Sequence, residues 1–159
     1  MRPTDVLAPD YFHKVVDCQW ACPAHTPVPE YIRLIATGRP ADAYMVNWRS
    51  NVFPGVLGRT CDRPCEPACR RGRVEERNTE KPEPVAICRL KRVAADYKGD
   101  VGALMPRPAD RRNGRRIACV GAGPASLTVA RDLALLGYEI TLFDRDPRTA
   151  GMIRSQIPR

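Results

Sequence analysis

Residues 18–23 read Cys18-Gln19-Trp20-Ala21-Cys22-Pro23, and residues 61–69 read Cys61-Asp62-Arg63-Pro64-Cys65-Glu66-Pro67-Ala68-Cys69. In both stretches neighbouring cysteines are separated by three residues, a spacing that places two thiols on one face of a helix or helical turn. Cys88 follows alone on a later segment. A disulfide across three residues is geometrically unfavourable, and the N-terminus does not resemble a secretory signal, so we interpret these thiols as metal ligands.

Three kinds of site are open for these cysteines. Zinc takes four thiolates tetrahedrally, but the C-x2-C pairs that are usual in structural zinc sites are absent from the sequence. A 4Fe-4S cluster is held by four cysteines in varied spacings, and Cys22-Pro23 is similar to the Cys-Pro pair that often closes a cluster-binding run. Inert buried thiols are the third interpretation. The spacing favours the iron-sulfur cluster.

Composition indicates a chain with much loop and little apolar core in its first half. Its 159 residues include 16 prolines and only 6% aromatic residues, with 43% hydrophobic residues in total. Bound metal can supply the stability that such a core lacks. The many reduced cysteines favour a cytoplasmic location. No apolar run approaches membrane-spanning length, so we expect a soluble protein with no membrane partner.

The chain is basic, with 26 Lys and Arg against 18 Asp and Glu and a net charge of +8. Such an excess fits nucleic acid, an acidic protein partner or a phosphate-rich cofactor. The arginines gather around residues 70–73 and 111–116, without interleaved aromatic residues or a nucleic-acid-binding motif. We therefore interpret them as solvated loop and linker, and expect no nucleic-acid partner.

Proline and glycine positions predict helices after the first cysteine pair. Thr26 and Pro27 fit the N-cap and the first position of a helix that ends near Thr37. A second helix is expected over residues 40–49. Residues 51–55 have the composition of a turn.

A third helix is expected to begin after Pro84 and to run over residues 85–97, carrying Cys88 and an apolar face of Ile87, Leu90, Val93 and Ala94. Residues 99–115 show little periodicity and indicate a linker. The cysteine-rich part therefore forms a predicted α-helical domain of residues 1–98.

The sequence changes character over residues 116–159. A short apolar run, Arg116-Ile117-Ala118-Cys119-Val120, meets Gly121-Ala122-Gly123-Pro124-Ala125-Ser126, and a helical pattern over residues 127–136 leads to a second apolar run over residues 139–143. Strand, glycine turn, helix and strand indicate the first β-α-β unit of a Rossmann-type domain. Two parallel strands and one helix do not cover both faces of such a sheet, so we expect a fragment or a chain completed by a partner.

The glycine turn departs from the G-x-G-x-x-G dinucleotide fingerprint only at Ser126. Gly121 permits the tight turn, Gly123 lets the backbone approach a pyrophosphate, and the helix N-terminus adds free N–H groups and a positive dipole. Asp144, about twenty residues further on, is in place to accept hydrogen bonds from an adenosine ribose. Cys119 lies inside the strand and is expected to be a buried core thiol, not a ligand.

Five motifs follow one another along the chain: Cys18-x-x-x-Cys22-Pro23-Ala24-His25-Thr26-Pro27, Phe53-Pro54-Gly55 before Gly58-Arg59-Thr60-Cys61, Pro64-Cys65-Glu66-x-x-Cys69, Pro84-Val85-Ala86-Ile87, and Gly121-Ala122-Gly123-Pro124-Ala125-Ser126-Leu127. This series, over about residues 10–159, resembles the small subunit of glutamate synthase and its relatives. The relatives include the N-terminal part of dihydropyrimidine dehydrogenase and the FAD subunit of ferredoxin-linked transhydrogenases. An ordered series is far more specific than either site motif alone.

The resemblance implies an α-helical ferredoxin-like domain with two 4Fe-4S clusters, followed by a Rossmann-type FAD-binding domain that an NAD(P)H domain interrupts. It implies Cys22, Cys61 and Cys65 as ligands of one cluster. The family's fourth ligand position falls on Lys91, which does not ligate while protonated. We expect Cys88, one turn earlier on roughly the same face, to be the fourth ligand.

The resemblance leaves the second cluster a candidate only. Cys18 and Cys69 would face it, whereas two further upstream cysteines of the family fall on Asp10 and His13, which would have to substitute as ligands.

For FAD, the resemblance and the glycine motif together imply contacts from the turn, the end of the second strand and the segment after it: Gly121, Gly123, Pro124, Ala125, Ser126, Asp144 and Gly151. Position 150 is Ala where the family usually has Gly.

The expected function is electron transfer between NAD(P)H-reduced FAD and a redox partner protein or larger subunit, through a 4Fe-4S cluster. Most of the FAD domain and the NAD(P)H domain are missing, so we expect no NAD(P)H turnover without the remainder of the flavoprotein, and we assign no catalytic residue. The alternative is a non-catalytic subunit or assembly module with a vestigial nucleotide-binding turn. A zinc-stabilised nucleic-acid binder is a third hypothesis.

Overall fold

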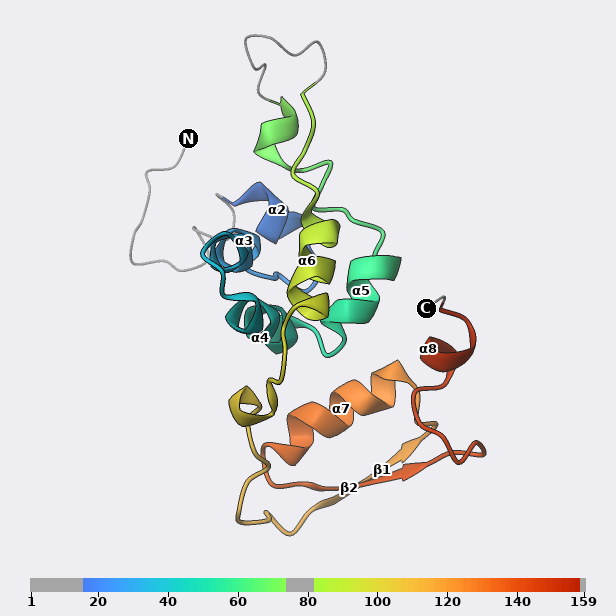
Figure 1. Cartoon of the computed structure of the whole chain (residues 1–159). Coiled ribbons are helices and arrows are strands. Elements are labelled where there is room, and N and C mark those ends of the chain that lie inside the picture. The colour runs from blue at the N-terminus through green and yellow to red at the C-terminus, as the bar shows by residue number, and fades with distance from the viewer. Residues whose placement is uncertain (1–15, 74–81, 158–159) are drawn as a thin grey trace, which may run out of the picture. The chain divides into compact units, whose positions relative to one another are not determined.

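The first of two compact units is helical. A computed structural model describes residues 16–73 and 82–157, and the chain divides into Met1–Asp100 and Val101–Arg159. The elements described in the first unit are α2 (Asp17–Ala21), α3 (Val28–Ala36), α4 (Pro40–Ser50), α5 (Pro54–Thr60), the 3-10 helix η1 (Arg70–Arg73) and α6 (Ile87–Asp96). α6 contacts α3, α4 and α5 and lies among the other helices (Figure 1), so the unit packs around it.

The core of this unit is small and includes thiols. α3 buries Val28, Tyr31 and Leu34, which recur every three residues. The Tyr31 side chain is fully buried, and its hydroxyl donates to the Ile87 carbonyl oxygen at 3.0 Å, which ties α3 to the start of α6. The buried cluster is completed by Ala43, Cys65, Cys69, Ile87 and Ala94. Two cysteines therefore stand where a larger domain would have aliphatic side chains.

The buried stripe of α6 differs from the predicted one. The stripe consists of Ile87, Cys88, Lys91, Ala94 and Ala95, whereas Leu90 and Val93, both expected to face the core, are only half-buried. A lysine thus occupies the middle of the face that α6 turns inward.

The prediction of Thr26 as a helix N-cap is wrong. α3 begins at Val28 with Pro27 as its N-cap residue. Thr26 is fully buried instead, and its Oγ1 accepts a hydrogen bond from Cys22 Sγ at 3.5 Å. The threonine hydroxyl therefore binds the cysteine segment before the helix and does not cap the helix.

The turn predicted over residues 51–55 is also wrong in part, because α5 begins inside it at Pro54. Proline is favourable at the first helical position, but Gly55 and Gly58 are weak helix formers. Helix propensity alone therefore does not predict a helix here. Gly58 is required by packing, since a Cβ there would lie 2.8 Å from the backbone nitrogen of Arg92 on α6.

The second unit is a β-α-β element. Its described elements are η2 (Gly102–Leu104), β1 (Arg116–Val120), α7 (Pro124–Ala134), β2 (Glu139–Phe143) and α8 (Met152–Ser155). β1 and β2 pair in parallel, with Arg116 opposite Glu139 and Val120 opposite Phe143, and α7 crosses between them and packs against β2 (Figure 1). The predicted order of strand, turn, helix and strand is confirmed.

Candidate iron-sulfur site and nucleotide-binding turn

Four thiols from separate segments come together in the helical unit. Cys22 follows α2, Cys61 follows α5, Cys65 lies in the next turn, and Cys88 is in the first turn of α6. The Cys88 side chain lies within hydrogen-bonding distance of Cys61 and close enough to Cys65 for their charges to interact. The charge of Cys65 also interacts with those of Cys22 and Cys61. The four cysteines expected at one cluster are thus linked in pairs, with Cys65 near Cys22, Cys61 and Cys88, and Cys88 near Cys61.

Burial and mutual repulsion favour the protonated form of two of these thiols. Burial raises the pKa of Cys65 to about 11. Burial also raises the pKa of Cys88, and the neighbouring Cys61 and Cys65 raise it further. For Cys22, burial raises the pKa, but hydrogen bonding with Thr26 and with the Ala24 backbone, together with the charge of Lys91, outweighs burial and lowers the pKa overall. A bound cation relieves the repulsion, because iron takes thiolates as ligands.

Two polar groups fix the backbone around these cysteines. The Cys88 N–H donates to Glu66 Oε1 at 3.0 Å, which links the turn after Cys65 to the first turn of α6. The Arg63 N–H donates to Cys61 Sγ at 3.4 Å, and Arg63 adopts a φ of +62° to do so. Hydrogen bonds to cysteine sulfur tune iron-sulfur potentials. Glu66 was not predicted as a site residue. Its position between Cys65 and Cys69 is the sequence signal for such a role.

Lys91, where the resemblance places the family's fourth ligand, is buried on α6 one turn after Cys88. Its positive charge acts to lower the pKa of Cys22, Cys65 and Cys88, so its ammonium group lies near all three thiols.

Cys18 and Cys69 form a separate pair. Cys69 is buried and Cys18 half-buried. Burial raises the pKa of Cys18, and the nearby Cys69 raises it further. The other two residues expected at a second cluster, Asp10 and His13, lie outside the described residues.

Within residues 16–73 and 82–157, no three His, Cys, Asp or Glu side chains converge closely enough to hold a single metal ion. A structural zinc site holds its sulfurs about 2.3 Å from one ion. A 4Fe-4S cluster instead takes one thiolate on each of four irons, so its ligands surround a larger group. Four cysteines from three stretches of the chain, Cys65 and Cys88 buried and Cys22 and Cys61 half-buried, are the donor set that such a cluster uses.

The glycine turn of the second unit is open to a ligand. Gly121 has a φ of +89°, and its N–H donates to the Phe143 carbonyl oxygen at 2.7 Å, which joins the two strand ends. Gly123 is the N-cap residue of α7, and nothing lies within 4 Å of where a Cβ would be at either glycine. Pro124, Ala125 and Ser126 form the first turn of α7. Cys119 is buried in β1, as predicted.

Asp144 follows β2 and closes on this turn. Its Oδ2 accepts a hydrogen bond from the Ala122 N–H at 2.5 Å, and its Oδ1 accepts one from the Asp146 N–H at 2.8 Å. These two hydrogen bonds lower the pKa of Asp144, and the bond from Ala122 has the larger effect. The carboxylate is therefore ionised at neutral pH and keeps lone pairs for a further donor.

Gly151 also lies against the turn. The Ala150 N–H donates to the Ala122 carbonyl oxygen at 2.8 Å, and a Cβ on Gly151 would be 3.5 Å from Gly123 Cα. The structure thus brings Gly151 and Asp144 to the two glycines of the motif, as the sequence analysis expects for FAD contacts.

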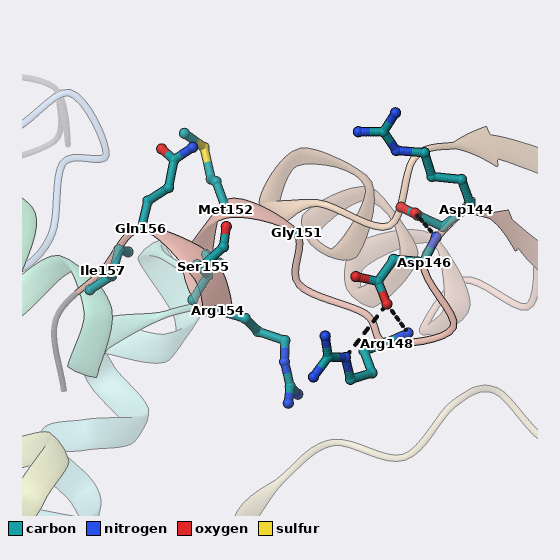
Figure 2. A pocket seen from close by; sticks show the side chains of 11 residues that line it. Asp144, Asp146, Arg148, Gly151, Met152, Arg154, Ser155, Gln156 and Ile157 are labelled. Atoms are coloured by element: carbon teal, nitrogen blue, oxygen red, sulfur yellow. Dashed lines mark hydrogen bonds and ion pairs between the residues drawn. The ribbon is translucent and has the colours of Figure 1, made fainter.

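An open cavity of about 710 Å³ adjoins Asp144 and is walled by the segment after β2 (Figure 2). It is lined by Asp144, Arg145, Asp146, Arg148, Gly151, Met152, Ile153, Arg154, Ser155, Gln156 and Ile157. Three arginines thus line a hollow beside the turn. The sequence analysis did not predict their role, although three arginines within ten residues of Asp144 are the visible signal.

Comparison with known protein families decides the assignment of the first unit. The model of the family described as dihydropyrimidine dehydrogenase domain II, 4Fe-4S cluster, matches residues 12–102, more than half of the chain. The chain belongs to this iron-sulfur family. A second model, described as an NAD(P)-binding Rossmann-like domain, matches residues 119–158.

Relatives of the iron-sulfur family match across both units. The chain is 36% identical over 89% of its length to the NADP(+)-dependent formate dehydrogenase subunit beta of Moorella thermoacetica. It is 36% identical over 89% of its length to the glutamate synthase [NADPH] small chain of Mycobacterium tuberculosis. It is 35% identical over 98% of its length to the NADPH-Fe(3+) oxidoreductase subunit beta of Geobacter sulfurreducens. The predicted resemblance to the glutamate synthase small-subunit-like family is confirmed.

The chain spans about a quarter of the length of these curated relatives: 22% of the first, 28% of the second and 23% of the third. In the part of the chain that the structure describes, every helix is too short or too polar to cross a membrane.

Proposed function

We propose that this chain transfers electrons between NAD(P)H-reduced FAD and a redox partner through a 4Fe-4S cluster, as part of a glutamate-synthase-small-subunit-like oxidoreductase. The observation that carries the proposal is that Cys22, Cys61, Cys65 and Cys88, from three stretches of the chain, form a connected group in which neighbouring thiols lie close enough for their charges to interact. Relatives named as NADPH-linked oxidoreductase subunits support it.

In this proposal the four cysteines are the cluster ligands, and residues 1–98 form an α-helical ferredoxin-like domain. When bound, the cluster supplies one-electron transfer. The chain's own residues would determine the surroundings of the cluster: the helices would exclude water, and the Arg63 N–H donates to the Cys61 sulfur. A second cluster would use Cys18 and Cys69 with Asp10 and His13.

Residues 116–159 would form the beginning of a Rossmann-type FAD-binding domain, after a linker of residues 99–115. The turn would cradle the FAD pyrophosphate through backbone N–H groups, and Asp144 would accept hydrogen bonds from the ribose. The remaining contacts would come from Gly121, Gly123, Pro124, Ala125, Ser126 and Gly151.

The remainder of the flavoprotein is the first partner that this proposal requires. Val120 is 90% exposed and Phe143 56% exposed at the ends of a two-stranded sheet, where helices on the faces of a complete sheet would cover them. The basic surface would favour an acidic redox partner or larger subunit. All seven cysteines are free of disulfides, which fits a cytoplasmic location.

The test of the cluster is a ligand substitution with a matched control. We expect the Cys88→Ser variant, purified anaerobically, to lose most of its iron and acid-labile sulfide, because serine is a poor ligand for this cluster type. Cys119→Ser, in the other unit, should keep both. Equal iron contents in the two variants would refute Cys88 as a ligand.

The FAD site has its own test. Flavin fluorescence titration should show weaker FAD binding by Asp144→Ala than by the unmodified chain, whereas Asp132→Ala, on exposed α7 surface, should bind like the unmodified chain. If neither iron nor FAD binds after anaerobic reconstitution, the alternative of a non-catalytic assembly module with a vestigial nucleotide-binding turn replaces the proposal.

A further inference from the structure

The inward face of α6 carries a cation. Lys91 is 5% exposed and is the one charged residue among the buried residues that the structure describes. It lies in the stripe of Ile87, Cys88, Ala94 and Ala95, so the packing of the helix holds its side chain inside the unit.

No carboxylate of the described residues compensates this charge. Across residues 16–73 and 82–157, the side chain of Lys91 takes part in no ion pair with Asp or Glu and no hydrogen bond. Glu66, next to Cys65 in the chain, accepts from the Cys88 N–H and pairs with Arg63 at 3.9 Å. Removing an ammonium group from water is costly unless an anion lies beside it.

Lys91 lies one turn after Cys88 on the same buried face of α6. Its charge acts on Cys22, Cys65 and Cys88, which are three of the four proposed ligands. Thiols that remain protonated are neutral and do not compensate an ammonium. Four thiolates on a 4Fe-4S core are a net anion in both redox states, and the anion gains one more negative charge on reduction.

We propose that Lys91 is the fixed counter-charge of the 4Fe-4S cluster and raises its reduction potential. This inference rests on the proposed function. In the half-reaction the oxidised cluster takes up one electron and no bond to Lys91 forms or breaks. The ammonium stabilises the reduced, more negative state more than the oxidised state, because the attraction between charges grows with the charge of the anion. Burial makes the effect larger than that of a surface lysine, because solvent screens it less.

α6 therefore has two roles at neighbouring positions of one face. Cys88 supplies a ligand, and Lys91, three residues later, supplies the charge. The position at which the family has a ligand would here hold a cation that tunes the potential.

The test is an EPR-monitored redox titration of the full chain, purified anaerobically, at fixed pH and ionic strength. Lys91→Met keeps a long side chain and removes the charge, and Lys91→Arg keeps the charge. Arg89→Met is the matched control, since it removes a positive charge from the exposed side of the same helix. We expect the potential to fall in Lys91→Met, to stay near that of the unmodified chain in Lys91→Arg, and to change little in Arg89→Met.

A potential in Lys91→Met that is unchanged or higher, with the cluster fully loaded, would overturn the inference. If Lys91→Met does not load iron, recovery of loading by Lys91→Arg supports the counter-charge, and failure of Lys91→Arg as well overturns it. Coupling of the EPR signal to 15N-labelled lysine would show that Lys91 binds iron directly and would also overturn it. Absence of a cluster from the unmodified chain is a different result, because it refutes the proposed function itself.

Discussion

Single residues in this chain are held in states that they would not adopt alone. Burial raises the pKa of Cys65 to about 11, so at neutral pH the thiol binds a proton unless a metal replaces it. Lys91 is a buried cation on a face where hydrophobic periodicity would place an apolar residue. A bound iron-sulfur cluster would hold Cys65 as a thiolate in place of the protonated thiol, and would place an anion beside the Lys91 cation.

Ala150 is a strained residue of the second unit. Its φ is +85°, in the left-handed region that favours glycine, and its N–H donates to Ala122 beside the nucleotide-binding turn. Ala150→Gly should relieve about 1 kcal/mol of strain and slow local opening roughly fivefold. Hydrogen exchange of the amides in residues 144–157 measures this opening.

The control for this prediction is Ala130→Gly, in the right-handed helix α7, which should accelerate exchange in its own segment. Faster exchange after Ala150→Gly would show that the left-handed conformation of Ala150 carries no strain.

At the scale of elements, the packing of α5 on α6 positions two of the proposed ligands. Gly58 on α5 allows the approach, because a Cβ there would lie 2.8 Å from the Arg92 nitrogen and 3.0 Å from its Cα. The ion pair of Arg59 with Asp96, at 3.0 Å, adds a polar link between the same helices.

Gly58→Ala should therefore destabilise the helical unit by about 1–3 kcal/mol, since α6 backbone atoms must move to admit the methyl group. Urea unfolding of the iron-loaded chain, followed by circular dichroism, measures the change. Gly55→Ala is the control on the same helix, because its Cβ would meet Ala95 at an ordinary 3.4 Å. A Gly58→Ala curve that matches the Gly55→Ala curve would contradict the packing.

Periodicity and motif spacing were sufficient to predict most elements. The cysteine spacing and the glycine turn led to the helical unit, β1, α7 and β2, since each carries a local signal. α5 was missed because its glycines serve contacts with α6 that a local pattern does not contain. The approach of Cys22 and Cys88 to Cys65 depends on long-range packing that the spacing does not contain. The resemblance implied Cys22 and Cys65, whereas Cys88 was expected from its place one turn before Lys91.

At the scale of the whole molecule, the two units depend on different kinds of stabilisation. The first has a small core that includes Cys65 and Cys69, whereas the second has a parallel strand pair with exposed apolar residues at its ends. Metal binding is therefore expected to stabilise the first unit alone.

Anaerobic removal of iron by a chelator should raise hydrogen exchange in α5 and α6 and leave β1, α7 and β2 unchanged. The physical reason is that thiols left without metal must take up protons inside a core that their ligation would hold together. Exchange that rises equally in both units would show that the cluster is not confined to the first.

The most direct test of the account is the iron and acid-labile sulfide content per chain of anaerobically purified protein, with an EPR spectrum after reduction. The account predicts about four of each and the signal of a reduced 4Fe-4S cluster, and about eight of each if the pair of Cys18 and Cys69 also binds one. Near-zero iron after anaerobic reconstitution, or zinc without sulfide, would contradict it.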